Sequence, residues 1–181
     1  MSSVKEYVRE TMRLAMDGTT PPKRKKLYRL RGVPMSMADQ WRDILYAEDN
    51  PGDAKLLWLS FREHGHLPCR LHIVHDGEAV LAFLRQEGCY AGMPRPRLLI
   101  LDIEMPGTKG WQVLETIRAT PALAMLPVVI LTGNLSSRDE EQRAALQPLA
   151  YFKKPMKLEE YPQLVAQLER ILTRTTCDVN Y

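Results

Sequence analysis

The sequence has little of what marks a membrane-spanning, secreted or dinucleotide-binding protein. No apolar run approaches the roughly 20 residues that span a bilayer, and residues Met1–Glu6 are polar and charged, unlike a secretory signal. The three cysteines are an odd number without a C-x-x-C pair, which argues against a disulfide framework. No G-x-G-x-x-G follows an apolar run, which disfavours a dinucleotide site. We therefore expect a globular protein of the reducing cytoplasm, with no membrane span.

Outside the N-terminal segment, basic and acidic residues are nearly equal in number. Residues 1–40 carry nine basic and four acidic side chains, whereas the rest of the chain carries 16 and 18. Apolar residues at helical spacing predict a short amphipathic helix before Gly18, and six of the nine residues 23–31 are basic. We predict an N-terminal extension over 1–40, one domain over 41–174 and a tail over 175–181. The basic stretch could bind nucleic acid or an anionic membrane surface, but we favour a solvated tether.

The body of the chain alternates between short apolar runs and segments with helical periodicity. The expected strands lie near 43–47, 70–74, 97–102, 127–132 and 149–153. The expected helices lie near 52–64, 76–88, 108–119, 137–146 and 158–173. Five strands that alternate with five helices indicate an α/β domain, whose parallel sheet is covered on both faces.

Polar side chains follow four of the expected strands at their carboxyl ends. They are Glu48 and Asp49 after the first strand, Asp102 at the third, Thr132 at the fourth and Lys154 after the fifth. The carboxyl ends of parallel strands lie side by side in such a sheet, and ligands bind there. Three acids, a hydroxyl and an amine suit a divalent cation and a phosphoryl group. Each signal alone is weak, but their conjunction on four strand ends disfavours solvated loops and turns.

This set of side chains favours a covalent phosphoryl site. Three carboxylates at neighbouring strand tips repel one another, and Mg²⁺ or Mn²⁺ would remove that penalty. The Asp102 carboxylate is the expected nucleophile, and would form an aspartyl-phosphate. We expect the Lys154 ammonium, the Thr132 hydroxyl and the Gly133 amide to hold the phosphoryl oxygens. A cis bond between Lys154 and Pro155 is a further expectation, because it would aim the lysine into the site.

Over about residues 42–174 the sequence resembles the receiver domain of two-component response regulators. Asp102 is followed at a distance of 30 residues by Thr132 and at 52 residues by Lys154, spacings that are usual in this family. The segments that carry the resemblance are Ala47–Asp53 (AEDNPGD), Leu101–Gly107 (LDIEMPG), Leu131–Gly133 (LTG) and Phe152–Pro155 (FKKP).

The resemblance implies a flavodoxin-like fold, which is a doubly wound sheet of strand order 2-1-3-4-5 with five helices. It implies phosphorylation of Asp102 by a sensor histidine kinase, in a phosphoacceptor that is not a turnover enzyme. It also implies that Mg²⁺ or Mn²⁺ is held by Asp49, Asp102 and the main-chain carbonyl of Glu104, with Glu48 acting through water.

A narrower resemblance is to small response regulators that partner phytochrome-type kinases. It rests on Glu48–Asp53 (EDNPGD), His75–Ala79 (HDGEA), Phe83–Leu84 and the proline-rich loop that ends at Pro96. It implies that the partner kinase is a bacteriophytochrome.

The same resemblance implies a conformational switch. Thr132 would move toward a new phosphoryl group, and the Tyr151 ring would then rotate inward. The affected face would comprise helix 137–146, strand 149–153 and helix 158–173, through which such domains often form homodimers. In this reading the protein is a phosphorylation-dependent module for protein–protein signalling.

Two other functions stay open at this point. An aspartate-nucleophile phosphotransferase would need Asp-x-Asp near the first strand, whereas Asp102-Ile103-Glu104 lies on the third. A nucleic-acid regulator would use the basic arm at 23–31, although no DNA-binding motif is visible and we expect nucleic acid to be an unlikely partner.

Overall fold

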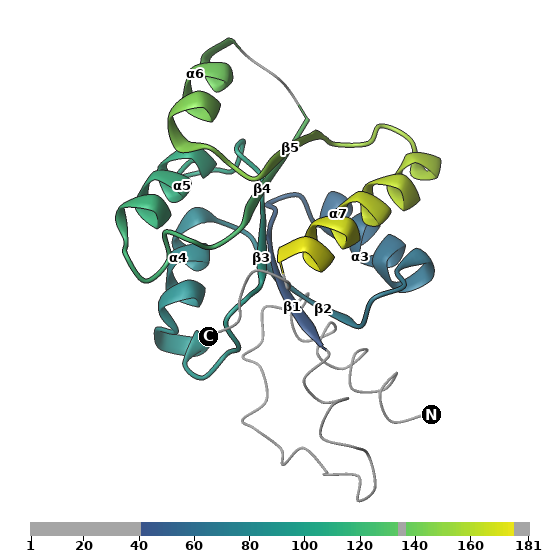
Figure 1. The fold of residues 1–181 in the computed structure, drawn as a ribbon, viewed down its shortest axis with the longest axis horizontal. Helices are drawn as coiled ribbons and strands as arrows, with labels where there is room; N and C mark the ends of the chain where they lie inside the picture. Colours follow the sequence, from purple (N-terminus) through teal and green to yellow (C-terminus); the bar gives the residue numbers. More distant parts are fainter. Residues whose placement is uncertain (1–40, 134–136, 176–181) are drawn as a thin grey trace, which may run out of the picture.

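The computed structural model describes residues 41–133 and 137–175, which form one α/β domain (Figure 1). Its sheet has five parallel strands in the order β2-β1-β3-β4-β5. The strands are β1 (Arg42–Ala47), β2 (Cys69–Val74), β3 (Leu98–Leu101), β4 (Val128–Thr132) and β5 (Ala150–Lys153). This order and the parallel pairing confirm the predicted flavodoxin-like fold.

Helices cover both faces of the sheet. They are α3 (Pro51–His64), α4 (Gly77–Arg85), α5 (Gly110–Ala119), α6 (Ser137–Leu146) and α7 (Tyr161–Thr175), with short 3-10 turns η1 (Gly88–Tyr90) and η2 (Leu158–Glu160). Figure 1 shows α4, α5 and α6 on one side of the sheet and α3 and α7 on the other. The connections return the chain to the same end of the sheet after each helix, so all five strands point the same way.

Two hydrophobic layers form because alternate residues of each strand point to opposite faces. On β3, Leu99 and Leu101 join the layer beneath α4 and α5, whereas Leu98 and Ile100 join the layer beneath α3 and α7. All four are fully buried. A strand that is apolar on both faces can be satisfied only by helices on both sides, which is why the apolar runs of this chain predict a doubly wound sheet.

Local chemistry sets where two of the helices begin and end. α3 begins at Pro51, because the Asn50 side chain accepts hydrogen bonds from the amides of Gly52 and Asp53. α4 ends at Arg85 rather than at the expected residue 88, because Gln86 takes a left-handed conformation with φ of 59°. The first cap fixes the turn from β1 into α3, and the second begins the connection from α4 to β3.

The predicted amphipathic helix and the basic stretch at 23–31 lie outside the described residues, as does the tail after Thr175. Within the described residues, no helix is both long and apolar enough to cross a membrane. The expected helix at 137–146 is present as α6, whose first three side chains are not described.

A buried carboxylate of α7 ties the end of α3 to the start of β2. Glu169 is 7% exposed, and its Oε1 accepts hydrogen bonds from the amides of His66 and Leu67, each at 2.7 Å. We expect Glu169→Ala to lower the free energy of unfolding by about 2 kcal/mol, because both amides lose a charged acceptor. Urea denaturation measures this, with Glu169→Gln expected to retain part of the stability. The matched control is Glu159→Ala, since Glu159 is exposed; equal stability of the two alanine variants would contradict the role given to Glu169.

Candidate functional site

Four strands deliver polar side chains to one edge of the sheet, as the sequence predicts. Glu48 and Asp49 follow β1, Asp102 follows β3, Thr132 ends β4, and Lys154 follows β5. Glu48 and Thr132 are fully buried and Asp102 is 2% exposed, whereas Asp49 lies at the surface. The site therefore combines buried polar side chains with one exposed acid, Asp49, at which solvent meets the cluster.

The acids form one cluster. Glu48, Asp49 and Asp102 each offer a carboxylate oxygen, and these atoms lie within 4.8 Å of one another. Carboxylate oxygens are the ligands that Mg²⁺ and Mn²⁺ prefer, and a dication relieves the repulsion between three neighbouring acids. The donor set present therefore fits a divalent metal.

Lys154 supplies the positive charge of the site. Its Nζ lies 2.6 Å from Asp102 Oδ2, 2.7 Å from Glu48 Oε2 and 3.2 Å from Asp53 Oδ2. Burial by itself would lower the pKa of this ammonium, but hydrogen bonds to Asp102 and Glu48 outweigh burial and raise the pKa above its ordinary value. Lys154 is therefore a fixed cation whose three donors are all directed at acids.

Glu48 is held by partners on two sides. The Tyr46 hydroxyl donates to Oε2 at 2.8 Å, and the Asn50 amide donates to Oε1 at 3.1 Å. Burial raises the pKa of the Glu48 carboxyl, which Lys154 and Tyr46 partly offset. Burial also raises the pKa of the Tyr46 hydroxyl, with the nearby Glu48 carboxylate adding to the effect. Tyr46 is therefore a hydrogen-bond donor to the acid cluster rather than an anion.

Two contacts, one at each oxygen, orient the Asp102 carboxylate. Oδ1 accepts a hydrogen bond from the Glu104 amide at 3.0 Å, and Oδ2 faces Lys154. The start of α5 packs directly on this residue: a Cβ on Gly110 would lie 2.4 Å from the Asp102 carbonyl oxygen. Position 110 therefore requires glycine. Its place next to the site was not predicted from the sequence.

Gly133, directly after β4, lies near the side chain of Glu104. Among the described residues, a Cβ on Gly133 would meet the Glu104 side chain, at 3.8 Å from Oε2. The Glu104 carboxylate thus stands over Gly133, beside the place where the Thr132 hydroxyl and Gly133 amide were expected to hold phosphoryl oxygens. An extra acid at this position adds negative charge at the mouth of the site.

One sequence prediction is wrong. No cis peptide bond occurs in the part of the chain that the structure describes, so the Lys154–Pro155 bond is trans. The Lys154 amide donates to the Thr132 carbonyl at 2.7 Å, which extends the pairing of β4 and β5 by one residue. That pairing brings the lysine to the acids from a trans bond, the form that proline peptides prefer by about 0.5–1 kcal/mol.

Two site residues were missed in the sequence. Asp53 contacts Lys154 from the first turn of α3, and Tyr46 contacts Glu48 from β1. A signal existed for Asp53, which lies three residues after the Asn50 cap and four after Asp49, and so belongs to the same strand-to-helix turn. For Tyr46 the signal was weaker, since a tyrosine in an apolar strand usually indicates core packing.

The fold and the acid cluster define the class of protein. It is a flavodoxin-like α/β domain with an acidic site that suits a cation at the carboxyl ends of its strands. Residues 44–166 match the model of the response regulator receiver domain. The chain therefore belongs to the response regulator receiver family, as its motifs indicate.

Phytochrome response regulators are among its relatives. Response regulator Rcp1 of Synechocystis sp. is 33% identical over 132 residues, which cover 73% of this chain and 89% of the relative. The phosphorylated cyanobacterial phytochrome response regulator RcpA superposes with a TM-score of 0.68 at 32% identity, covering 74% of this chain and 95% of that one. The Mn(2+)-bound form of Rcp1 gives a TM-score of 0.65 at 33% identity, with 71% and 91% covered. The acidic cluster and the Mn(2+)-bound relative together point to divalent metal binding.

Proposed function

We propose that the protein is a phosphorylation-dependent signalling switch whose phosphoacceptor is Asp102. The observation that carries this proposal is the environment of the Asp102 carboxylate. It is nearly fully buried, with one oxygen on a main-chain amide and the other 2.6 Å from the Lys154 ammonium. A buried carboxylate at an open acidic edge, held at both oxygens, is a positioned nucleophile rather than a surface acid.

The proposed reaction is a phosphoryl transfer from a histidine of the partner kinase. An Asp102 carboxylate oxygen forms a bond to phosphorus as the phosphorus–nitrogen bond breaks, and the released imidazole keeps the electron pair and takes up a proton. Lys154, the Thr132 hydroxyl and the Gly133 amide stabilise the charge on the equatorial oxygens. The domain provides the acceptor and positions it, so we propose a phosphoacceptor that catalyses its own modification and not a turnover enzyme.

We further propose that a divalent cation belongs to the working site. Asp49, Asp102 and the main-chain carbonyl of Glu104 would hold Mg²⁺ or Mn²⁺, with Glu48 acting through water. When bound, the cation supplies neutralising charge for the phosphoryl oxygens. Asp49 is exposed, so a cation can reach the cluster from solvent.

The proposed partner is a sensor histidine kinase of the phytochrome type. The likeness to phytochrome response regulators, which include the cyanobacterial RcpA, supports this proposal. A second copy of the chain is the other proposed partner, through the face of α6, β5 and α7, where Leu149 is 52% exposed. The proposed organisation is a receiver domain over 41–174, an extension over 1–40 and a tail over 175–181.

The test of the proposed function is labelling by a small phosphodonor. We expect acetyl phosphate with Mg²⁺ to add one phosphoryl group per chain, seen as a single step in intact mass. Removal of the metal with EDTA should prevent the label, because the acid cluster then repels the incoming anion. Ca²⁺, which prefers more ligands and a larger cavity, is the control ion. Equal labelling with EDTA and with Mg²⁺ would contradict the proposed metal site.

Thr132→Ala separates modification from response. Thr132 is fully buried at the end of β4, and Asp102 and Lys154 contact each other directly, so we expect that pair to stay in place without the hydroxyl. We expect the variant to accept the phosphoryl group but to show a weaker change in oligomeric state or conformation, measured by size-exclusion chromatography and near-UV circular dichroism. Val128→Ala, at the other end of the same strand, controls for a general loss of packing. An undiminished response in Thr132→Ala would refute the coupling through the hydroxyl.

A further inference from the structure

The Tyr151 ring of β5 lies between an aromatic ring and a cation that come from two different helices. Trp111 of α5 stacks on it with ring centroids 6.4 Å apart and an interplanar angle of 23°. Arg143 of α6 places its guanidinium carbon 5.6 Å from the centre of the same ring. Both distances are in the range of favourable stacking and cation–π contacts. Three elements that are separate in sequence therefore meet at one side chain.

Tyr151 and Thr132 point to the same face of the sheet. Tyr151 is in register with Ile130, and both belong to the layer beneath α4, α5 and α6. Thr132 is two residues after Ile130 on β4, so strand alternation puts its side chain on that face as well. Thr132 therefore lies on the side of the sheet where Trp111 and Arg143 contact the Tyr151 ring.

Arg143 differs from the other arginines that lie over rings. Arg62 lies over Trp58 and pairs with Glu63, and Arg70 lies over Trp41 and pairs with Asp43. Arg143 forms no ion pair with any carboxylate whose side chain the structure describes.

Among the side chains that the structure describes, the Tyr151 ring is the partner over which the Arg143 guanidinium lies. A displaced ring would therefore leave this exposed cation without its described partner.

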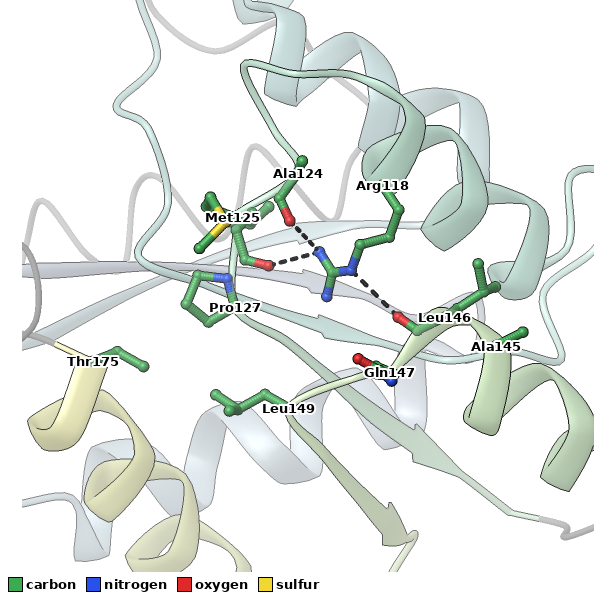
Figure 2. Close-up of a pocket in the computed structure, with 10 residues that line it drawn as sticks. Arg118, Ala124, Met125, Pro127, Ala145, Leu146, Gln147, Leu149 and Thr175 are labelled. Carbon is green, nitrogen blue, oxygen red and sulfur yellow. Dashed lines mark hydrogen bonds between the residues drawn. The ribbon is translucent and has the colours of Figure 1, made fainter.

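The described side chains of α6 show few other attachments to the domain. Leu146, in its last turn, is the described α6 residue that packs on the core. Its carbonyl accepts a hydrogen bond from Nε of Arg118 at 3.3 Å, while Nη1 of Arg118 binds the carbonyls of Ala124 at 2.9 Å and Leu126 at 3.1 Å. Figure 2 shows this guanidinium in a pocket of about 460 Å³ beside the end of α6. The Arg143–Tyr151 contact is thus a second attachment, one turn before the first.

We propose that Trp111 and Arg143 form a clamp on Tyr151, in which Arg143 is the latch that couples the ring to α6. The proposal rests on the proposed function, and on the switch that the resemblance to receiver domains implies, in which the Tyr151 ring moves when Asp102 is phosphorylated. Release of the ring frees the Arg143 guanidinium and loosens α6, so the output is an exposed cation on a more mobile helix. A partner that reads this state would present a carboxylate to α6.

A double-mutant cycle tests the clamp without any phosphodonor. Arg143→Ala, Tyr151→Leu and the double variant are compared by urea denaturation. An exposed cation–π contact predicts a coupling of about twofold to fivefold in the unfolding equilibrium constant. Arg143 paired with Phe152, which points to the other face of β5, is the control cycle. Coupling no larger than in the control would overturn the proposal.

Fluorescence tests the latch in the signalling cycle. With Trp41→Phe and Trp58→Phe as background, Trp111 is the remaining tryptophan and reports directly on the ring. Arg143→Ala should shift the unphosphorylated emission toward the phosphorylated emission, by about twofold to fivefold in the ratio of the two states. Arg143→Lys should restore part of the difference, because an ammonium also binds the ring face.

Intact mass separates the two possible failures of this experiment. A phosphorylated protein whose Trp111 emission is the same with Arg143 and with Arg143→Ala, in both states, overturns the latch. A protein that takes no phosphoryl group overturns the proposed function instead, and the double-mutant cycle then still decides whether the clamp exists.

Discussion

Replacement of Asp102 by asparagine is expected to abolish covalent labelling by acetyl phosphate or by a kinase. The amide is not a nucleophile toward phosphorus, whereas the buried carboxylate is held at both oxygens and presented to the open edge of the site. Intact mass of the variant after incubation with phosphodonor and Mg²⁺ measures this. Persistent labelling of Asp102→Asn would show that another residue accepts the phosphoryl group.

The same variant should keep its fold, which makes the result interpretable. The asparagine Oδ1 can still accept the hydrogen bond from the Glu104 amide. Lys154 keeps Glu48 and Asp53 as partners when its contact to Asp102 is lost. Circular dichroism and urea denaturation of the variant should therefore resemble those of the parent. Loss of both label and fold would leave the fold, and not the nucleophile, as the explanation.

Lys154→Ala is expected to have the largest effect on stability. Glu48 and Asp102 are buried, and Lys154 is the described cation that contacts both. Removing one partner of a buried ion pair leaves uncompensated charge, which typically lowers the free energy of unfolding by about 3–5 kcal/mol. Urea denaturation in EDTA measures the loss. Because Mg²⁺ would supply positive charge to the same acids, the difference between variant and parent should shrink when the cation is present.

Lys153→Ala is the matched control for this prediction. Lys153 is the preceding residue, has the same charge and is exposed. Its replacement should change stability by less than about 0.5 kcal/mol, as is usual for a surface site. Similar losses in the two variants would contradict the role given to Lys154 as the counter-ion of the cluster. If Mg²⁺ leaves the loss of stability in Lys154→Ala unchanged, the cation does not neutralise the same acids as the lysine.

The fold could be predicted because its signals are local. β3 and β4 are apolar on both faces, so both faces of the sheet must be covered. A helix between two strands carries the chain back across the sheet, so that the next strand runs parallel to the first. The ends of helices were less predictable. α4 stops at Arg85 because one glutamine adopts a left-handed conformation, which neither its identity nor the periodicity of the helix indicates. The meeting of the strand ends was expected from the parallel topology, and the strand order from the resemblance that the spacings of Asp102, Thr132 and Lys154 support.

The site was predictable where a residue lies at a strand end and obscure where it lies elsewhere. Glu48, Asp49 and Asp102 are placed together by topology alone, and the structure finds them within 4.8 Å. Asp53 reaches the site from a helix, so its contact with Lys154 depends on the orientation of α3.

Contacts between different helices were equally hidden in the sequence. The Trp111–Tyr151–Arg143 clamp needs three elements to be packed before any pair of its residues comes within reach. The prediction of a cis bond before Pro155 was wrong. The hydrogen bond from the Lys154 amide to the Thr132 carbonyl already directs the lysine toward the acids.

The measurement that tests the central claim most directly is the chemical mapping of the phosphoryl group. Borohydride reduces an aspartyl-phosphate to homoserine, which tandem mass spectrometry locates in the peptide that follows β3. The protein treated with acetyl phosphate and Mg²⁺ should give homoserine at position 102, and the sample prepared in EDTA should not. Homoserine at Asp49 or Asp53, or a stable phosphoryl group on another residue with aspartate intact at 102, would contradict the account.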